Sequence, residues 1–233
     1  MKTRYLEVNS EEMARNRHLD RYLKEIRPSG SSVYVGLGTG INIPILLHYF
    51  DHVAVVEPEG EILDRFSRIH PNLVGGAVTL IQKSLEDVSI DVAVGSVFLI
   101  GVSEHLFNVE AALDKLDRLA LPQADVFLIF NNPRSLHRQF GVATGHIKNC
   151  FEITEPEGPR GHGHYQLFEV KDVLSLLSKL RFRPIKVTGF YVKPLPTFLT
   201  NSLASHLVSG FMDCFVHLPP DQHAFSFVHA RRK

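Results

Sequence analysis

The sequence predicts a doubly wound α/β domain, in which a mostly parallel sheet carries helices on both faces. Short apolar runs rich in β-branched residues alternate with helix-length segments up to residue 130, which is the pattern of βαβ units. A glycine-rich loop, Gly36-Leu37-Gly38-Thr39-Gly40, follows the first of these runs. In open α/β sheets, ligands bind at the carboxyl ends of the strands near the first strand. We therefore expect one α/β domain with a ligand site at residues 36–40.

The elements follow one another in a regular order. Asn9 and Glu12 predict a capping box at the start of the first helix, and Pro28-Ser29-Gly30 ends that helix. The apolar run 32–35 is the first strand, and a helix with Pro44 in its first turn or two follows the glycine loop. Further strands are expected at 53–57, 77–82, 97–100 and 126–130, and further helices at 59–70 and 105–120.

The alternation breaks after Phe130. About forty residues separate it from the next predicted helix, 171–181, and a connection of this length usually forms a lid or a binding module. Two more strands are expected at 185–192 and 224–230, the last of them at or near an edge of the sheet. The sequence therefore predicts a lid insertion after the fifth strand.

The composition is that of a globular protein. Of 233 residues, 44% are hydrophobic and 21% are charged, which excludes a disordered or fibrous chain. Lysine and arginine number 25, as do aspartate and glutamate, so binding to nucleic acid by counterion release is not expected. Two cysteines, Cys150 and Cys214, indicate a reducing compartment. We expect a cytoplasmic protein without a membrane span or signal peptide, because no apolar run has the required length.

The glycine loop and the acid after the second predicted strand indicate an adenosine-type cofactor. Gly36, Gly38 and Gly40 let the backbone turn sharply and let a ligand approach it. Glu57 ends the second strand, and its carboxylate can accept hydrogen bonds from both ribose hydroxyls. A nicotinamide dinucleotide is less well matched, because Ile41 stands where the G-x-G-x-x-G pattern has its third glycine. A P-loop is excluded, because no Lys-Ser/Thr pair follows the glycines.

Several ordered segments resemble class I S-adenosylmethionine-dependent methyltransferases, over roughly residues 30–192. The G-x-G-x-G spacing, the turn Val56-Glu57-Pro58 and the stretch 101–108 are similar to cofactor motifs of that family. Residues 119–126 are similar to the turn before its fifth strand. The segments 132–138 and 161–165 resemble the lid of the small-molecule, type 11/23-like branch, which acts on sugars, quinones and natural products.

The resemblance implies a Rossmann-like sheet, mostly parallel with the last strand antiparallel, and S-adenosylmethionine as the cofactor. It implies a single domain over 1–233, made of an N-terminal helix (1–30), a cofactor-binding half (31–130), a substrate lid (131–170) and a C-terminal helix with strands (171–233). The implied cofactor residues are Gly36, Gly38, Thr39, Gly40, Glu57, Pro58, Ser84, Leu85 and Gly101.

Three positions depart from the family pattern. Tyr34 stands where the family usually has an acid that orients the amino-acid end of the cofactor. Ser84 replaces an acid near the adenine, and Ser96 replaces one before the fourth strand. The sequence is therefore also compatible with a protein of the same fold that binds the cofactor, or serves as a scaffold, without catalysis.

His105 and Glu104 are the predicted catalytic residues. Methyl transfer mainly requires that the acceptor and the methyl carbon be held close and aligned. A hydroxyl acceptor also needs a base, for which histidine is suited near neutral pH, and Glu104 is expected to orient the imidazole or the acceptor. No metal is expected, because Gly101 stands where ubiquinone-type O-methyltransferases carry the first glutamate of a metal-associated E-x-x-E-H run.

The predicted lid carries the expected substrate residues, which are Arg134, His137, Arg138, His162, His164 and Tyr165. Arginine forks match phosphate, so an anionic acceptor is one hypothesis, and a solvated loop face is the alternative for the arginines. For the histidines, ordinary loop packing is the alternative to substrate contact. Charge supports the hypothesis, because residues 1–130 carry 12 basic and 18 acidic side chains whereas residues 131–233 carry 13 and 7. A zinc site at His162 and His164 is not expected, because cysteine or carboxylate partners are lacking.

The sequence therefore predicts a small-molecule methyltransferase that transfers to oxygen of a sugar, quinone or natural-product intermediate and yields S-adenosylhomocysteine. An N-methyltransferase and a catalytically inactive protein of the same fold remain open. The oligomeric state is also open, and a homodimer is one option, because the apolar stretch 199–215 could cover a partner as easily as the sheet.

Overall fold

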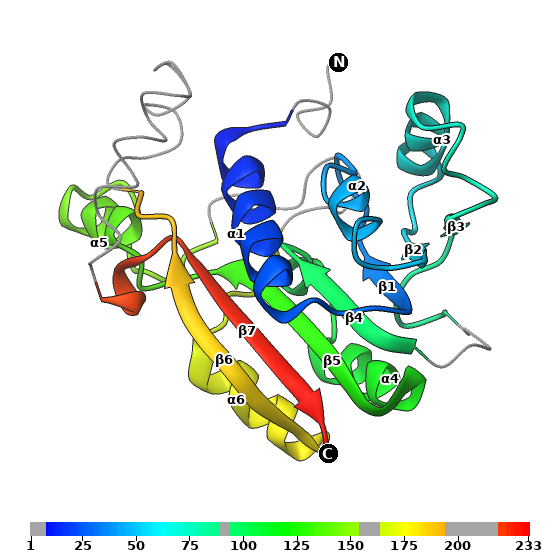
Figure 1. The fold of residues 1–233 in the computed structure, drawn as a ribbon. Coiled ribbons are helices and arrows are strands. Elements are labelled where there is room, and N and C mark those ends of the chain that lie inside the picture. The colour runs from blue at the N-terminus through cyan, green and yellow to red at the C-terminus, as the bar shows by residue number, and fades with distance from the viewer. Residues whose placement is uncertain (1–7, 89–93, 154–163, 194–218) are drawn as a thin grey trace.

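The computed structural model describes residues 8–88, 94–153, 164–193 and 219–233. The described part contains one seven-stranded sheet in the order β3-β2-β1-β4-β5-β7-β6 (Figure 1). The strands are β1 (Ser31–Val35), β2 (His52–Val56), β3 (Val78–Ile81), β4 (Val94–Ile100), β5 (Ala120–Asn131), β6 (Phe182–Phe190) and β7 (Phe225–Arg232). The pairs among β1 to β5 are parallel, whereas β7 pairs antiparallel with both β5 and β6. The predicted sheet, with its antiparallel last strand next to an edge, is confirmed.

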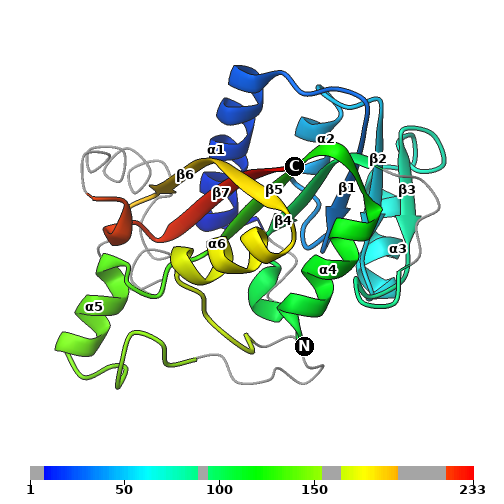
Figure 2. The ribbon, with the colours of Figure 1, turned by 90° about the horizontal axis from the view of Figure 1, so that it is seen from below.

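Helices cover both faces of this sheet, as predicted. One face carries α1 (Ser10–Ile26), α2 (Ile43–Leu46) and α3 (Gly60–Ile69), and the other carries α4 (Val109–Leu119) and α6 (Val170–Lys179) (Figure 2). Each face has its own hydrophobic cluster, one packed on α1 to α3 and the other on α4 and α6. A further helix, α5 (Leu136–Ala143), lies beyond the end of β5 (Figure 1).

The first helix begins and ends where its sequence predicts. Asn9 Oδ1 accepts a hydrogen bond from the Glu12 N–H at 2.9 Å, and Glu12 Oε2 accepts one from the Asn9 N–H at 3.2 Å, which completes the capping box. The helix stops at Arg27, whose φ of 48° is left-handed. Leu19 and Leu23 are buried against the sheet. The amino end of α1 is thereby fixed near the carboxyl ends of the central strands (Figure 1).

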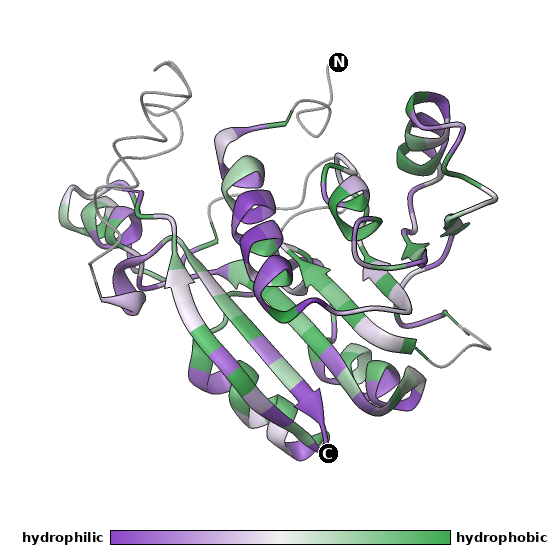
Figure 3. Ribbon diagram, in the orientation of Figure 1, coloured by the Kyte–Doolittle hydropathy of each residue, from purple (hydrophilic) through white to green (hydrophobic). Residues whose placement is uncertain are grey.

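The inner strands β1, β2 and β4 are mainly apolar, whereas the edge strand β6 is mixed (Figure 3). Four of the five residues in each of β1 and β2 are buried, as expected for parallel strands covered on both faces. In β6, by contrast, Ile185 and Val187 are 45% and 42% exposed. The sheet therefore ends at β6 on one side and at the four-residue strand β3 on the other.

Four elements differ from the prediction. The predicted helix 105–120 is a 3₁₀ turn, Ser103–His105, followed by α4 from Val109, because Asn108 Oδ1 caps α4 by accepting from the Ala111 N–H at 3.0 Å. The strand β5 begins six residues earlier than predicted and passes an irregularity in its pairing with β4. The helix after the glycine loop has only four residues, and α5 was not predicted.

Three sequence features fall outside the described residues: the apolar stretch 199–215, Cys214 and His162. No helix in the part of the chain that the structure describes is both long enough and apolar enough to cross a membrane.

Candidate functional site

The glycine loop joins β1 to α2 at the point where the strand order reverses. Gly36, Gly38 and Gly40 have φ values of +74°, +53° and +77°, which favour glycine. A Cβ at Gly36 would overlap the Val102 side chain, and one at Gly40 would lie 2.7 Å from Phe66. Nothing lies within 4 Å of a Cβ at Gly38. The loop is therefore packed at both ends and open in its middle.

Glu57 lies at the end of β2 beside this loop and is only 5% exposed. Its Oε2 accepts from the Leu37 N–H at 2.8 Å, and its Oε1 accepts from the Glu59 N–H at 3.0 Å. A carboxylate offers about four acceptor positions, so two remain for donors of a ligand. The backbone bonds fix the carboxylate, and the remaining acceptors suit a pair of ribose hydroxyls.

The first turns of α1 cover the loop from the other side. Glu12 Oε1 accepts from the Thr39 hydroxyl at 2.9 Å, and Asn16 Nδ2 donates to the Ile41 carbonyl at 3.0 Å. Sequence reasoning missed these contacts, because the helix was interpreted only from its caps and apolar spacing. The Thr39–Glu12 contact nevertheless shows that the first helix forms a wall of the site.

Arg15 extends from the same helix to the end of β4. A Cβ at Gly101, whose φ is +67°, would overlap the Arg15 guanidinium. The guanidinium also lies over the Phe225 ring, 5.2 Å from its centroid. Gly101 therefore lets the Arg15 guanidinium lie against the end of β4. No motif in the sequence indicates Arg15 as a site residue.

The turn after β4 is tied to β5 through Glu104, which is 1% exposed. Its Oε1 accepts from the Asn131 N–H at 2.7 Å, and its Oε2 accepts from the Ser103 hydroxyl at 3.2 Å. Its backbone carbonyl accepts from the Tyr165 N–H at 2.8 Å. The carboxylate of Glu104 thus holds the 3₁₀ turn, and with it His105, against the end of β5.

His105 and two predicted lid residues come together at this turn. The rings of His105 and His164 lie 4.7 Å apart between centroids, and Tyr165 meets Phe107 edge-on at 6.0 Å. Tyr165 and Phe107 are 38% and 85% exposed. The structure therefore groups His105, His164 and Tyr165 at an accessible position above the ends of β4 and β5.

Arg134 and Arg138 bind groups of the connection between β5 and α6. This β5–α6 segment comprises the described residues 132–153 and 164–169. Arg134 pairs with Glu169 and lies over the Phe151 ring, 5.7 Å from its centroid. Arg138 Nε donates to the Cys150 carbonyl at 2.7 Å, and its guanidinium also binds the Glu152 carbonyl. Arg138 therefore holds two backbone carbonyls of this segment, whereas the Arg134 side chain is 58% exposed and makes a surface ion pair.

His137 lies in a different cluster, which joins α5, α1 and the end of β6. Burial, assisted by the charge of Lys193, lowers the pKa of His137 to about 3. Its Nδ1 is buried without a hydrogen-bond partner in the described part of the chain. Lys193 is 5% exposed on its side chain and pairs with Glu11. Burial alone would raise the pKa of Glu11, but the pairing with Lys193 outweighs it and lowers that pKa.

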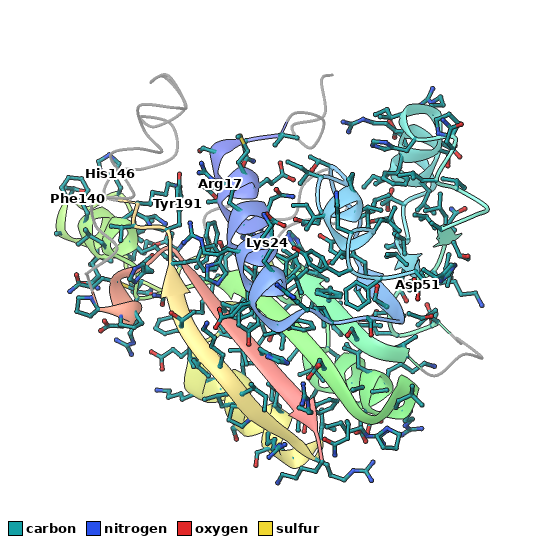
Figure 4. All side chains as sticks on the ribbon, in the orientation of Figure 1. Arg17, Lys24, Asp51, Phe140, His146 and Tyr191 are labelled. Atoms are coloured by element: carbon teal, nitrogen blue, oxygen red, sulfur yellow. The ribbon has the colours of Figure 1, made fainter. Side chains whose placement is uncertain are left out.

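Tyr191, which Figure 4 places between α1 and α5, donates to the Ser10 hydroxyl at 3.5 Å.

Comparison with solved structures identifies the fold. The N-methyltransferase NodS from Bradyrhizobium japonicum WM9, in complex with S-adenosylhomocysteine, is 10% identical with a TM-score of 0.62, covering 97% of this chain and 90% of that one. Magnesium protoporphyrin IX methyltransferase from Synechocystis PCC 6803, with bound S-adenosylhomocysteine, is 13% identical with a TM-score of 0.61, over 97% and 89% of the two chains. A Burkholderia thailandensis 1,6-didemethyltoxoflavin-N1-methyltransferase is 12% identical with a TM-score of 0.59, over 96% and 80%.

The chain has the class I methyltransferase fold. No protein-family model matches the sequence, and no curated protein matches it. The fold is therefore established by the arrangement of the strands and helices.

In this methyltransferase fold, the three departures noted in the sequence have distinct surroundings. Tyr34 is fully buried, which raises its pKa to about 12, and its hydroxyl accepts from Asn42 Nδ2 at 2.6 Å. The Ser84 hydroxyl donates to Asp87 Oδ2 at 2.8 Å, next to the buried Leu85. Ser96 is 3% exposed inside the sheet. Tyr34 is therefore uncharged at the position where the methyltransferase pattern has an acid.

Metal ligands do not cluster in the described residues, where no three His, Cys, Asp or Glu side chains are grouped to hold an ion.

Proposed function

We propose that the protein is an S-adenosylmethionine-dependent methyltransferase that acts on a small molecule. The observation that carries the proposal is the buried Glu57 carboxylate, held by two backbone N–H groups beside a glycine loop that is open at Gly38. These residues fit the cofactor, because a ribose needs the two remaining acceptors of Glu57 and close access to the backbone. When bound, S-adenosylmethionine would supply an electrophilic methyl group.

The cofactor would lie along the carboxyl ends of β1, β2 and β4. Glu57 would bind the ribose, with Pro58 beside it, and Ser84 and Leu85 would border the adenine. The glycine loop, Gly36 to Gly40 with Thr39, would lie under the cofactor, and Gly101 would lie next to its amino-acid end. This arrangement leaves the turn 103–107 and the β5–α6 segment to receive the acceptor.

For an oxygen acceptor, we propose His105 as the base that removes the hydroxyl proton. Its position at the accessible group with His164 and Tyr165 supports this role, and Glu104 positions it by holding the turn. His137 belongs to the separate cluster between α1, α5 and the end of β6; it is neutral at physiological pH and would border the acceptor as a polar group from that side. A sugar, quinone or natural-product intermediate would fit such a site, and the proposal includes a biosynthetic role in the cytoplasm.

N-methylation is the second candidate, favoured by two of the similar structures, which are N-methyltransferases. An amine acceptor needs only to be unprotonated and correctly positioned. It is more easily deprotonated than a hydroxyl, so its methylation would depend less on His105. An anionic acceptor remains part of the proposal through Arg134 and Arg138, although Arg138 also binds the Cys150 carbonyl and Arg134 also pairs with Glu169. Replacing either arginine with alanine should raise the KM for an anionic acceptor.

Titration calorimetry on the full chain tests the proposal. Wild-type protein should bind S-adenosylmethionine and S-adenosylhomocysteine, and Glu57→Gln should weaken both, because the amide offers fewer acceptors to the ribose. Glu59→Gln, two residues further on, is the matched control, because only its backbone N–H contacts Glu57. If wild-type protein binds neither compound, the proposed function is wrong.

A further inference from the structure

Two oppositely charged side chains of α1 face the proposed cofactor site. Glu12 accepts from the Thr39 hydroxyl at 2.9 Å and from the Asn9 N–H at 3.2 Å. Its carboxylate forms no ion pair with any residue that the structure describes. A partly buried carboxylate that touches the glycine loop and lacks a cation can bind a positively charged group there.

Arg15 lies one helical turn further along the same helix. Its guanidinium rests against Gly101 and over the Phe225 ring. Within the described ranges it makes neither a hydrogen bond nor an ion pair, with Glu12 or with any other residue. Its guanidinium is therefore available to a ligand, and the planar fork of an arginine fits a carboxylate bidentately.

The strand below these residues lacks a charge that would complement a cation. Tyr34 is buried and neutral, and its hydroxyl is bound by Asn42. Asn42 in turn accepts from Asn16 Nδ2 at 3.2 Å, so this corner of the site is a closed network of neutral groups. The available charges over the loop therefore come from the helix and not from β1.

We propose that Glu12 and Arg15 bind the zwitterionic amino-acid end of the cofactor, with Glu12 next to its ammonium and Arg15 next to its carboxylate. The inference rests on the proposed function and specifies the part of the ligand that α1 recognises. It also explains how the chain can bind this cofactor although Tyr34 replaces an acid. The first helix, and not the first strand, supplies the missing negative charge.

The test compares ligands that differ only at the amino-acid end. S-Adenosylhomocysteine carries both charges, whereas 5′-methylthioadenosine keeps the adenosine and the sulfur but lacks the amino-acid end. Calorimetry on the full chain should show that Glu12→Gln and Arg15→Gln each raise the Kd for S-adenosylhomocysteine about tenfold, because each removes one charged hydrogen bond. The Kd for 5′-methylthioadenosine should stay the same in both variants.

Decarboxylated S-adenosylmethionine separates the two roles. Wild-type protein should prefer S-adenosylmethionine to the decarboxylated compound, and Arg15→Gln should abolish that preference, whereas Glu12→Gln should keep it. Arg17→Gln is the matched control, because Arg17 is exposed on the same helix (Figure 4). Glutamine at position 12 can still close the capping box, and Arg15→Lys provides a second, charge-conserving variant that should lose only part of the affinity.

The outcomes distinguish the inference from the proposed function. If wild-type protein binds both adenosine compounds, and Glu12→Gln and Arg15→Gln bind S-adenosylhomocysteine as tightly as wild type, the inference is wrong and the function stands. If wild-type protein binds neither compound, both are wrong. Equal losses for 5′-methylthioadenosine and S-adenosylhomocysteine would also overturn the inference, because they would indicate general damage to the site.

Discussion

The hydroxyl of Tyr22 lies 2.7 Å from Nδ1 of His229, although 207 residues separate them in the chain. The other ring nitrogen, Nε2, lies 2.8 Å from Asp125 Oδ1, and Asp125 also accepts two hydrogen bonds from Arg231, at 2.7 and 3.0 Å. These contacts join α1, β7 and β5 in one polar chain within the apolar core. They fix the first helix on the sheet from the end opposite the glycine loop.

Replacement of Tyr22 with phenylalanine should reduce the free energy of unfolding by about 1–3 kcal/mol, because it leaves buried Nδ1 of His229 without its partner. Urea denaturation measures the loss. Tyr49→Phe is the control, since the Tyr49 hydroxyl contacts Asp20 at the rim of the protein, at 3.2 Å, and its removal should cost less than about 0.5 kcal/mol. Equal losses in the two variants would contradict a role for the buried network.

Acid should destabilise the protein through His18. Its ring stacks on Phe190 at 3.9 Å between centroids, and its Nε2 is buried without a partner among the described residues. Burial, with a smaller effect of Arg21, lowers the pKa of His18 from 6.5 to about 4. Between these two pH values the unfolded chain binds the extra proton, so the free energy of unfolding falls by about 1.4 kcal/mol per pH unit as the pH drops.

The variant His18→Phe keeps a stacked ring but cannot be protonated. Its free energy of unfolding should therefore vary less between pH 6.5 and pH 4 than that of the wild type. The remaining slope comes from His137, whose pKa is lowered to about 3, and, at the acid end, from carboxyl groups with lowered pKa values such as Glu11 and Asp125. Denaturation at pH 7, 6, 5 and 4.5 gives the two slopes. A variant slope equal to that of the wild type would show that His18 is not the group that titrates.

Alanine substitutions in the glycine loop should separate stability from ligand affinity. Gly36→Ala should cost more than about 2 kcal/mol of stability, because the left-handed φ alone costs about 1–2 kcal/mol and the new methyl group would overlap Val102. Gly38→Ala meets no neighbour and should cost only the conformational part. Its methyl group lies on the open side, so the Kd for S-adenosylhomocysteine should rise. Thermal unfolding and calorimetry measure the two effects, and a larger stability loss at Gly38 than at Gly36 would be the contrary result.

Arg138 should hold the β5–α6 segment together. Arg138→Lys removes the fork that binds the carbonyls of Cys150 and Glu152, because lysine cannot reproduce that planar geometry. Amide hydrogen exchange in residues 147–152 should therefore become faster, while exchange in β4 and β5 stays unchanged. Arg134→Lys is the control, since Arg134 is 58% exposed on its side chain and its ion pair contributes little. Unchanged exchange in the Arg138 variant would contradict this role and would show that other contacts hold the segment.

The strands β1, β2 and β4 were predictable because each contains a short buried apolar run with β-branched residues, and the topology follows from the alternation of strands with helices. The errors occur where local chemistry overrides periodicity. Asn108 caps α4, which begins four residues after the predicted start, and asparagine is a recognisable cap residue in the sequence. The helix α5 has eight residues and includes Gly141, so its sequence carries too little periodicity to predict.

The loop side of the candidate site was predictable, because Gly36 to Gly40 and Glu57 lie at the ends of adjacent strands. The helix side was not. Glu12 contacts Thr39, which lies 27 residues further along the chain. In the sequence alone, neither Glu12 nor Arg15 can be distinguished from a solvent-exposed residue of a helix. Only the packing of α1 over the strand ends places these charges at the loop.

The two ends of the sheet determine how the protein can associate. On one side β6 presents Arg183, Pro184 and Lys186 with an irregular register between the last two, and on the other side β3 offers only four residues. A proline, charged side chains, a break in register and a short strand are the features that block strand-by-strand addition of a second chain. In the described part of the chain, these features disfavour edge-to-edge pairing at the exposed apolar positions of β6, so its helices and loops are better suited than its sheet edges to contact a second copy.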